Sequence, residues 1–208
     1  MAEQNSIQVF IVAANISAIL SVAQQEAKKL SLTAKNARAI AIRAGEKAMG
    51  FKVITDFIDE FANLTIQCAN EINELSLHFA KVAMDSSNYK EFLGRLDNVK
   101  DKNVDLNHKG VFRNLYTNTE KTARDCDAEC QSLVRNLESL LETIQTQMRA
   151  SGFIAATSKV EAARAEEYKD NLDSVAENIA VASGTIMNCV NRSFHWLREY
   201  SPNARSLY

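Results

Sequence analysis

The sequence predicts an all-α fold: an elongated antiparallel coiled-coil four-helix bundle, made of two helical hairpins with both turns at one end. Three observations support this fold. The 208 residues include only six Gly and one Pro, so long stretches lack helix breakers. Apolar residues recur at alternating steps of four and three, the spacing of a coiled-coil seam. In both halves of the chain, small seam residues precede a turn and large ones follow it.

The first hairpin is expected over residues 5–85, with its turn near Gly45 and Gly50. Its seam passes from Leu30, Ala34, Ala37, Ala41 and Ala44 before the turn to Phe51, Ile54, Ile58, Phe61 and Thr65 after it. If the arms fold back on each other, seam residues equally far from the turn share a layer, so Ala37 meets Ile58. The small residues thus make room for the large ones, and each layer keeps a similar volume.

The second hairpin is expected over residues 117–200, because the same arrangement recurs 121 positions later. Identities at this offset include Arg43/Arg164, Glu46/Glu167 and Cys68/Cys189, which favours a duplication, although any two heptad helices match partly by chance. The second turn, expected over Glu166–Asn171, lacks glycine and is compatible with a tight turn or a continuous helix. We favour the turn, because the switch from small to large residues recurs across it.

Residues 86–116 are polar and are expected to connect the hairpins, with one short helix around Leu93 and Leu96. Residues 1–208 then form a single bundle domain. Arms of about 36 residues at about 1.5 Å each predict a rod of roughly 54 Å.

Composition excludes several classes of partner. The net charge of −2, from 24 basic and 26 acidic residues, offers no one-signed surface for nucleic acid or an anionic membrane. The apolar run "IQVFIVAANISAIL" is 14 residues long and contains Asn15, which is too short and too interrupted for a membrane span. It has no basic segment before it and no cleavage site, so we expect a cytoplasmic protein without membrane insertion, with reduced cysteines.

The sequence gives no support for an enzyme. A helical-bundle di-iron site needs Glu-x-x-His pairs, and His78, His108 and His195 all lack a Glu three residues earlier. Cys126 and Cys130 lie one helical turn apart, with no nearby His to complete a zinc site. We therefore expect no catalysis, no metal and no cofactor.

Residues around the two turns follow a further pattern: the first copy reads "NARAIAIRAGEKAMGF" and the second "VEAARAE". Both resemble the tip of the cytoplasmic signalling hairpin of bacterial chemoreceptors, the methyl-accepting chemotaxis proteins, with the pattern N-A-A-x-E-A-A-R-A-G-E-x-G-x-G-F-x-V-V. The matching positions are Asn36, Ala37, Ala41, Arg43, Ala44, Gly45, Glu46, Gly50, Phe51, Val53 and Ile54, then Glu161, Ala162, Ala163, Arg164 and Ala165. The tip glutamate is replaced by Ile40 in the first copy, and the asparagine by Thr157 in the second.

The resemblance implies a tip that touches a histidine kinase and its coupling adaptor, with two fused hairpins in place of a dimer. We therefore expect a soluble chemoreceptor-like signalling or adaptor protein that binds the chemotaxis histidine kinase, the coupling adaptor or chemoreceptors. The expected partner-binding residues are Asn36, Ile40, Arg43, Glu46, Glu161, Arg164 and Glu167. Two alternatives stay open: a structural homo-oligomeric bundle without kinase contact, and a sensor bundle that binds a small molecule.

Several tip residues also have a purely structural interpretation. Arg43 could pair with carboxylates of a neighbouring helix or remain a solvated cation at a helix end. Glu46 suits the N-terminus of the returning helix. Ile40, Ile42 and Phe57 could form a partner patch, but apolar positions beside the seam of a four-helix bundle are usually core.

Overall fold

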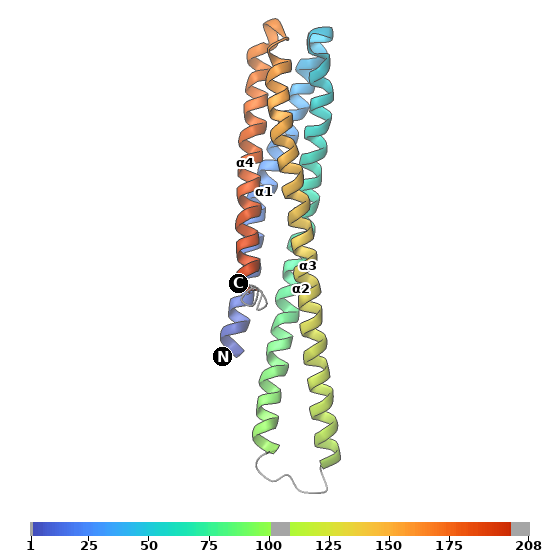
Figure 1. Cartoon of the computed structure of the whole chain (residues 1–208), viewed down its shortest axis with the longest axis vertical. Coiled ribbons are helices and arrows are strands. Elements are labelled where there is room, and N and C mark those ends of the chain that lie inside the picture. The colour runs from blue at the N-terminus through green and yellow to red at the C-terminus, as the bar shows by residue number, and fades with distance from the viewer. Residues whose placement is uncertain (1, 101–108, 201–208) are drawn as a thin grey trace.

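The computed structural model describes residues 2–100 and 109–200, which form a long rod of four helices (Figure 1). The helices are α1 (Ala2–Ala44), α2 (Met49–Lys100), α3 (Lys109–Ala162) and α4 (Lys169–Tyr200), with 3-10 helices η1 (Gly45–Ala48) and η3 (Glu166–Tyr168) in the turns. No strand occurs among the described residues. The predicted all-α bundle is confirmed.

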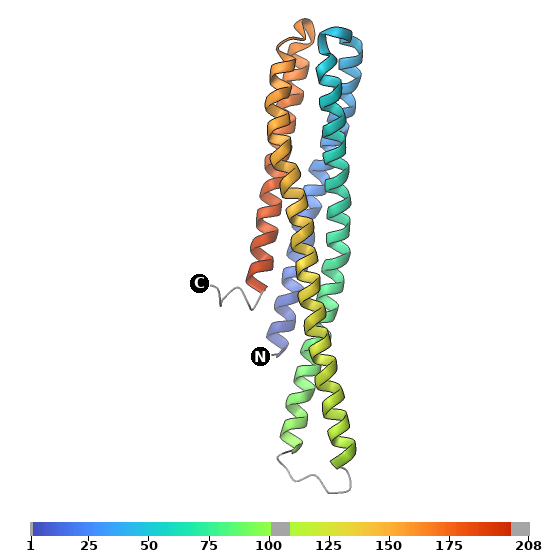
Figure 2. The ribbon, with the colours of Figure 1, turned by 45° about the vertical axis from the view of Figure 1, so that its right-hand side comes forward.

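The helices are arranged as two antiparallel hairpins, with both turns at the same end of the rod (Figures 1 and 2). Helix α1 packs against α2 and α4, and α3 packs against the same two helices. Helices α1 and α3 therefore lie on one diagonal of the bundle and α2 and α4 on the other. The helices that enter the turns occupy one diagonal, and those that leave them occupy the other.

The predicted seams form the core. Every seam residue of α1 from Val9 to Ala44 is buried, and so is every seam residue of α3 from Leu137 to Ala162. Continued at the same steps of four and three, the seam of α2 reaches Leu75, and Trp196 is the equivalent position of α4, 121 residues later. Among the seam side chains that the structure describes in α2 and α4, these two are only half-buried. Near the end of α4 the fully buried side chain is that of Leu197, one residue after Trp196.

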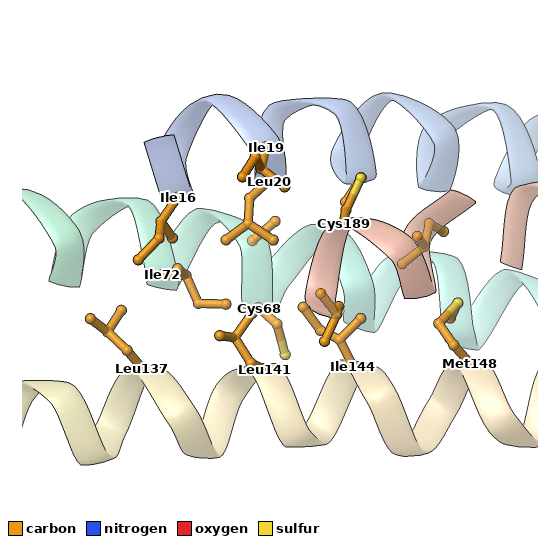
Figure 3. Packing of buried hydrophobic residues seen from close by; sticks show 14 of the residues in the cluster. Ile16, Ile19, Leu20, Cys68, Ile72, Leu137, Leu141, Ile144, Met148 and Cys189 are labelled. Carbon is orange, nitrogen blue, oxygen red and sulfur yellow. The ribbon is translucent and has the colours of Figure 1, made fainter. Parts of the chain in front are cut away.

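Small and large side chains share the core as the heptads predict. Ala37, Ile58 and Ile179 are fully buried in one core cluster near the turns. Further along the rod, the core is made of larger side chains from α1 and α3, including Leu20 and Leu141 (Figure 3). Near the turns, small alanine side chains of α1 thus lie in the same core cluster as large side chains of α2. The volume of the core side chains therefore stays similar along the rod.

Several hydroxyl groups inside the core donate within their own helix. The hydroxyl of Thr65 donates to the carbonyl oxygen of Phe61 at 2.8 Å, one helical turn earlier. Three buried serines donate to another helix: Ser31 to Asp59 at 2.6 Å, Ser86 to Asp127 at 2.6 Å and Ser151 to Ser183 at 2.7 Å. The register of the helices therefore depends on side-chain volume together with a few hydrogen bonds between helices.

We predict that Ala37→Phe destabilises the bundle by about 1–3 kcal/mol, because it places a second large side chain beside Ile58. Ala39→Phe is the control, because Ala39 is exposed on the same helix. Chemical denaturation of both variants measures the difference. Equal midpoints for the two variants would show that the layer pairing is wrong.

The two hairpins repeat specific surface contacts as well as seam positions. Two kinds of contact recur 121 positions apart: the ion pairs Arg38–Asp56 (2.9 Å) and Lys159–Glu177 (3.0 Å), and the hydrogen bonds Gln24–Asn70 (2.6 Å) and Gln145–Asn191 (3.3 Å). In each case the partners lie on the two arms of one hairpin. This repetition supports the duplication proposed from the sequence.

The second turn is a true turn built without glycine. Gly45 has φ +60°, and Glu166, its equivalent 121 positions later, has φ +45°. Helix α3 ends at Ala162 and α4 begins at Lys169. The second turn thus spans residues 163–168, three residues earlier than the predicted Glu166–Asn171, because Glu166 itself adopts the left-handed conformation that reverses the chain.

Glu166→Gly is predicted to stabilise the protein by about 0.5–1 kcal/mol, because the left-handed region costs an L residue about 1–2 kcal/mol. Part of this gain is lost to the greater freedom of glycine in the unfolded chain. Gly45→Glu, the reciprocal change, is expected to destabilise by a similar amount. Urea titration of both variants tests the pair, and shifts of the same sign would contradict the shared turn geometry.

The expected connector with one short helix is wrong for the described residues. Helix α2 continues to Lys100 and α3 starts at Lys109, so the two helices extend as a pair beyond α1 and α4 (Figure 2). Residues 101–108 lie outside the described part. The prediction failed because the apolar seam in this region is narrow, with Leu96 and Ala123 buried among polar neighbours.

Within the described residues, one stretch, Val9–Ala44, is long and apolar enough to cross a membrane by length and composition alone. A core helix of a soluble protein passes the same test. In the bundle the seam of this stretch packs in the core, and 39% of its most apolar window is buried. A cytoplasmic location without membrane insertion stays a prediction.

Candidate functional site: the hairpin tips

The predicted partner-binding residues gather at the turn end of the rod, on both hairpins. Five of them are exposed and two are half-buried: Asn36, Arg43, Glu46, Arg164 and Glu167 in the first group, Ile40 and Glu161 in the second. Ile40 packs against the core cluster near the turns. The structural interpretation thus holds in part for Ile40.

Glu161 joins the two hairpins at the tip. Its carboxylate accepts a hydrogen bond from Arg164 Nη1 at 3.1 Å within hairpin two. The same side chain also lies against Gly50 of hairpin one, so closely that a Cβ on Gly50 would overlap the Glu161 carboxylate. Gly50 was expected in the turn, but it belongs to the first turn of α2, where its missing side chain makes room for Glu161.

The charged residues of the first tip are less constrained. Arg43 lies in the last turn of α1, and Glu46 lies in η1, just before α2. Neither makes an ion pair with another described side chain. A cation near a helix C-terminus and a carboxylate near the start of the next helix both suit the helix dipoles. Both side chains are exposed.

The contact between Gly50 and Glu161 predicts coupling between the hairpins. In a Glu161→Ala background, Gly50→Ala should stabilise α2 by about 0.5–1 kcal/mol through helix propensity. With Glu161 present, the new methyl group must displace the carboxylate, so the gain should shrink or reverse. A double-mutant cycle in urea measures this coupling. Identical effects of Gly50→Ala in both backgrounds would contradict the contact.

Hairpin one also carries an exposed apolar surface beside its turn, here called the tip patch: Ile42, Met49, Val53 and Phe57. Their exposed fractions are 64%, 64%, 56% and 44%. Ile42 and Val53 are equally far from the turn, so they lie at the same level on the two arms. Met49, Val53 and Phe57 follow at steps of four along α2, which places them on one side of that helix.

The tip patch has no counterpart on hairpin two. At the equivalent positions, 121 residues later, the chain has Ala163, Asp170, Ser174 and Asn178, which are small or polar. The two hairpins share their turn geometry and core pattern but differ at this surface. Since packing of the core does not require large apolar side chains here, the patch is a feature of hairpin one alone.

Sequence reasoning found only part of this patch. Ile42 and Phe57 were considered as a partner surface or as core, and the structure places both at the surface, although the Phe57 ring lies 6.5 Å from the Phe61 ring. Met49 and Val53 were missed as surface residues. Alignment of the two copies by their 121-residue offset would have found them, because only one copy has apolar residues at these positions.

The cysteine and histidine side chains do not assemble a reactive centre in the described part of the chain. Burial is the main cause that raises the pKa of all four thiols, and the pKa of Cys130 rises to about 11. Such thiols are protonated at neutral pH and are poor nucleophiles and metal ligands. No group of three or more His, Cys, Asp or Glu side chains is placed to hold a metal among the described residues.

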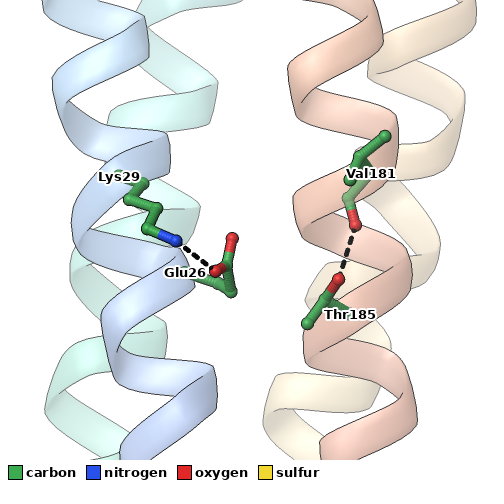
Figure 4. A network of polar contacts seen from close by, with 4 residues as sticks. All are labelled: Glu26, Lys29, Val181 and Thr185. Carbon is green, nitrogen blue, oxygen red and sulfur yellow. Dashed lines mark hydrogen bonds and ion pairs between the residues drawn. The ribbon is translucent and has the colours of Figure 1, made fainter.

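Many contacts on the sides of the rod stay within one helix. The ammonium group of Lys29 lies 2.7 Å from the Glu26 carboxylate, and Thr185 donates to the Val181 carbonyl oxygen at 3.0 Å (Figure 4). Exposed ion pairs of this kind contribute about 0–1 kcal/mol each. They keep the helix surfaces polar without defining a binding site.

Comparison with protein-family models, with curated proteins and with solved structures gave no match for this chain.

Proposed function

We propose that the protein is a chemoreceptor-like signalling or adaptor protein that binds a chemotaxis histidine kinase or coupling adaptor through the tip of hairpin one. The observation that carries this proposal is the tip patch. Its four apolar side chains lie beside the residues that resemble a chemoreceptor tip, and they are exposed although the core does not need them.

The surroundings of the tip patch fit a protein partner. Exposed apolar groups at one end of the rod are favourable anchors of an interface, because their burial releases water. Arg43 and Lys52 are exposed near the patch and make no ion pair with another described side chain. A partner with an apolar surface bordered by carboxylates would complement both features.

The proposal is tested by binding of the purified chain to the chemotaxis kinase and to the coupling adaptor, measured by calorimetry. In the patch variant, Ile42→Ala, Met49→Asp and Val53→Ser give hairpin one the residues of hairpin two. We expect its Kd to rise at least tenfold, which corresponds to about 1.4 kcal/mol. The control, Phe153→Ser with Val181→Ser, removes exposed apolar groups from hairpin two and should bind like the parent.

A second arm of the experiment tests the charges. Reversal of Arg43 and Arg164 to Glu should weaken binding while circular dichroism stays unchanged, since exposed charges contribute little to stability. The proposal fails if neither kinase nor adaptor binds the parent chain. It also fails if the patch variant keeps the parent affinity.

A further inference from the structure

The end of the rod opposite the turns is built from fewer helices. Helix α4 ends first, α1 ends next, and only α2 and α3 continue beyond them (Figures 1 and 2). We call residues 89–99 of α2 and 110–127 of α3 the open-end extension. Beyond the end of α4 only α1 covers the pair α2 and α3, and beyond the end of α1 the pair lies alone (Figures 1 and 2).

The open-end extension exposes a series of large apolar side chains. They are Tyr89, Phe92, Val99, Val111 and Leu115, with exposed fractions of 38%, 40%, 48%, 72% and 44%. Together with buried Leu96, the residues of α2 follow steps of three and four, which is the spacing of the bundle seam. Tyr89 and Leu96 continue the seam that runs through Phe79 and Val82 at steps of four and three, whereas Phe92 and Val99 lie beside that seam.

We propose that the open-end extension binds a second copy of this chain. In this dimer, the extensions of two chains lie against each other across a two-fold axis and complete a four-helix bundle. A two-fold axis pairs the same surface with itself, so each apolar series covers the other.

The net charge of the open-end extension favours binding of a second copy of the chain over binding of a strongly charged partner. Residues 89–99 contain two basic and two acidic side chains, and residues 110–127 contain three of each, so both parts are neutral. Several of these charges are paired within the chain, as in Lys90–Asp127 at 2.7 Å. Two neutral surfaces approach each other without net repulsion, and neither attracts a polyanion.

The length of the extension sets the expected strength of the dimer. An overlap of 11 to 18 residues measures roughly 17–27 Å along the helix axis. Such an interface falls at or below the size of a standard complex, about 800 Å² per partner. We therefore expect a reversible dimer with Kd in the micromolar range, joined end to end with the tips pointing away from each other.

Sedimentation equilibrium of the full-length chain, from low to high micromolar concentration, tests the dimer. The parent should change from monomer to dimer over this range. Phe92→Glu with Leu115→Glu should raise the dimer Kd at least tenfold, because it buries four carboxylates in the complex. Phe153→Glu with Val181→Glu is the matched control on the exposed surface of hairpin two, and it should dimerise like the parent.

X-ray scattering of the dimer gives an independent readout. An end-to-end dimer has a maximum dimension far longer than that of the monomer, whereas a side-by-side dimer does not. If the Glu variant loses helicity in circular dichroism, Phe92→Gln with Leu115→Gln replaces it. A parent that stays monomeric, a side-by-side dimer, or equal weakening by the control variant would overturn the proposal. The inference is independent of the proposed function, because the extension and the tip patch lie at opposite ends.

Discussion

Constant core volume is the constraint on which this structure depends. In a rod only four helices wide, each layer holds few side chains, so a large residue in one helix requires a small one in a neighbour. The alanines of α1 meet this condition near the turns, where Phe51, Ile54 and Ile58 return along α2. Side-chain volume acts on the register together with a few hydrogen bonds between helices, such as that from Ser31 to Asp59.

The two hairpins show how a duplicated unit can keep its interior and change its surface. The left-handed turn residue is Gly45 in one copy and Glu166 in the other, and the backbone follows the same path in both. Core layers tolerate few changes, because each side chain touches others from several helices. Surface positions carry no such constraint. At one of them, the first copy has Val53 and the second copy has Ser174 at the equivalent position. A surface residue that differs between the two hairpins, while their core positions agree, is therefore informative about function.

Much of the fold could be predicted from the sequence, because heptads and layer volumes are regular properties of the chain. The limits were local. A non-glycine residue with positive φ leaves no composition signal, which displaced the predicted second turn by three residues. The polar segment after Ser86 concealed two continuing helices, since a two-helix pair needs only a narrow seam. At the tip, Arg43, Glu46, Arg164 and Glu167 are exposed and Glu161 is half-buried. The contact of Gly50 with Glu161 depends on packing between the two hairpins, which the pattern of a single helix does not contain.

The rod separates two apolar surfaces of different character. The tip patch belongs to one hairpin of a section that is four helices wide, and its residues lie outside the buried core. The open-end extension exposes apolar residues on a part of α2 and α3 that α4 does not cover. A surface of the first kind is suited to a partner with a different structure, whereas a surface of the second kind is suited to further helices. Along α2, 32 residues separate Phe57 of the tip patch from Tyr89 of the open-end extension, so the two surfaces lie roughly 50 Å apart at about 1.5 Å per residue. At that distance they can be occupied at the same time, so self-association at the open end would present two tips to partners without blocking either.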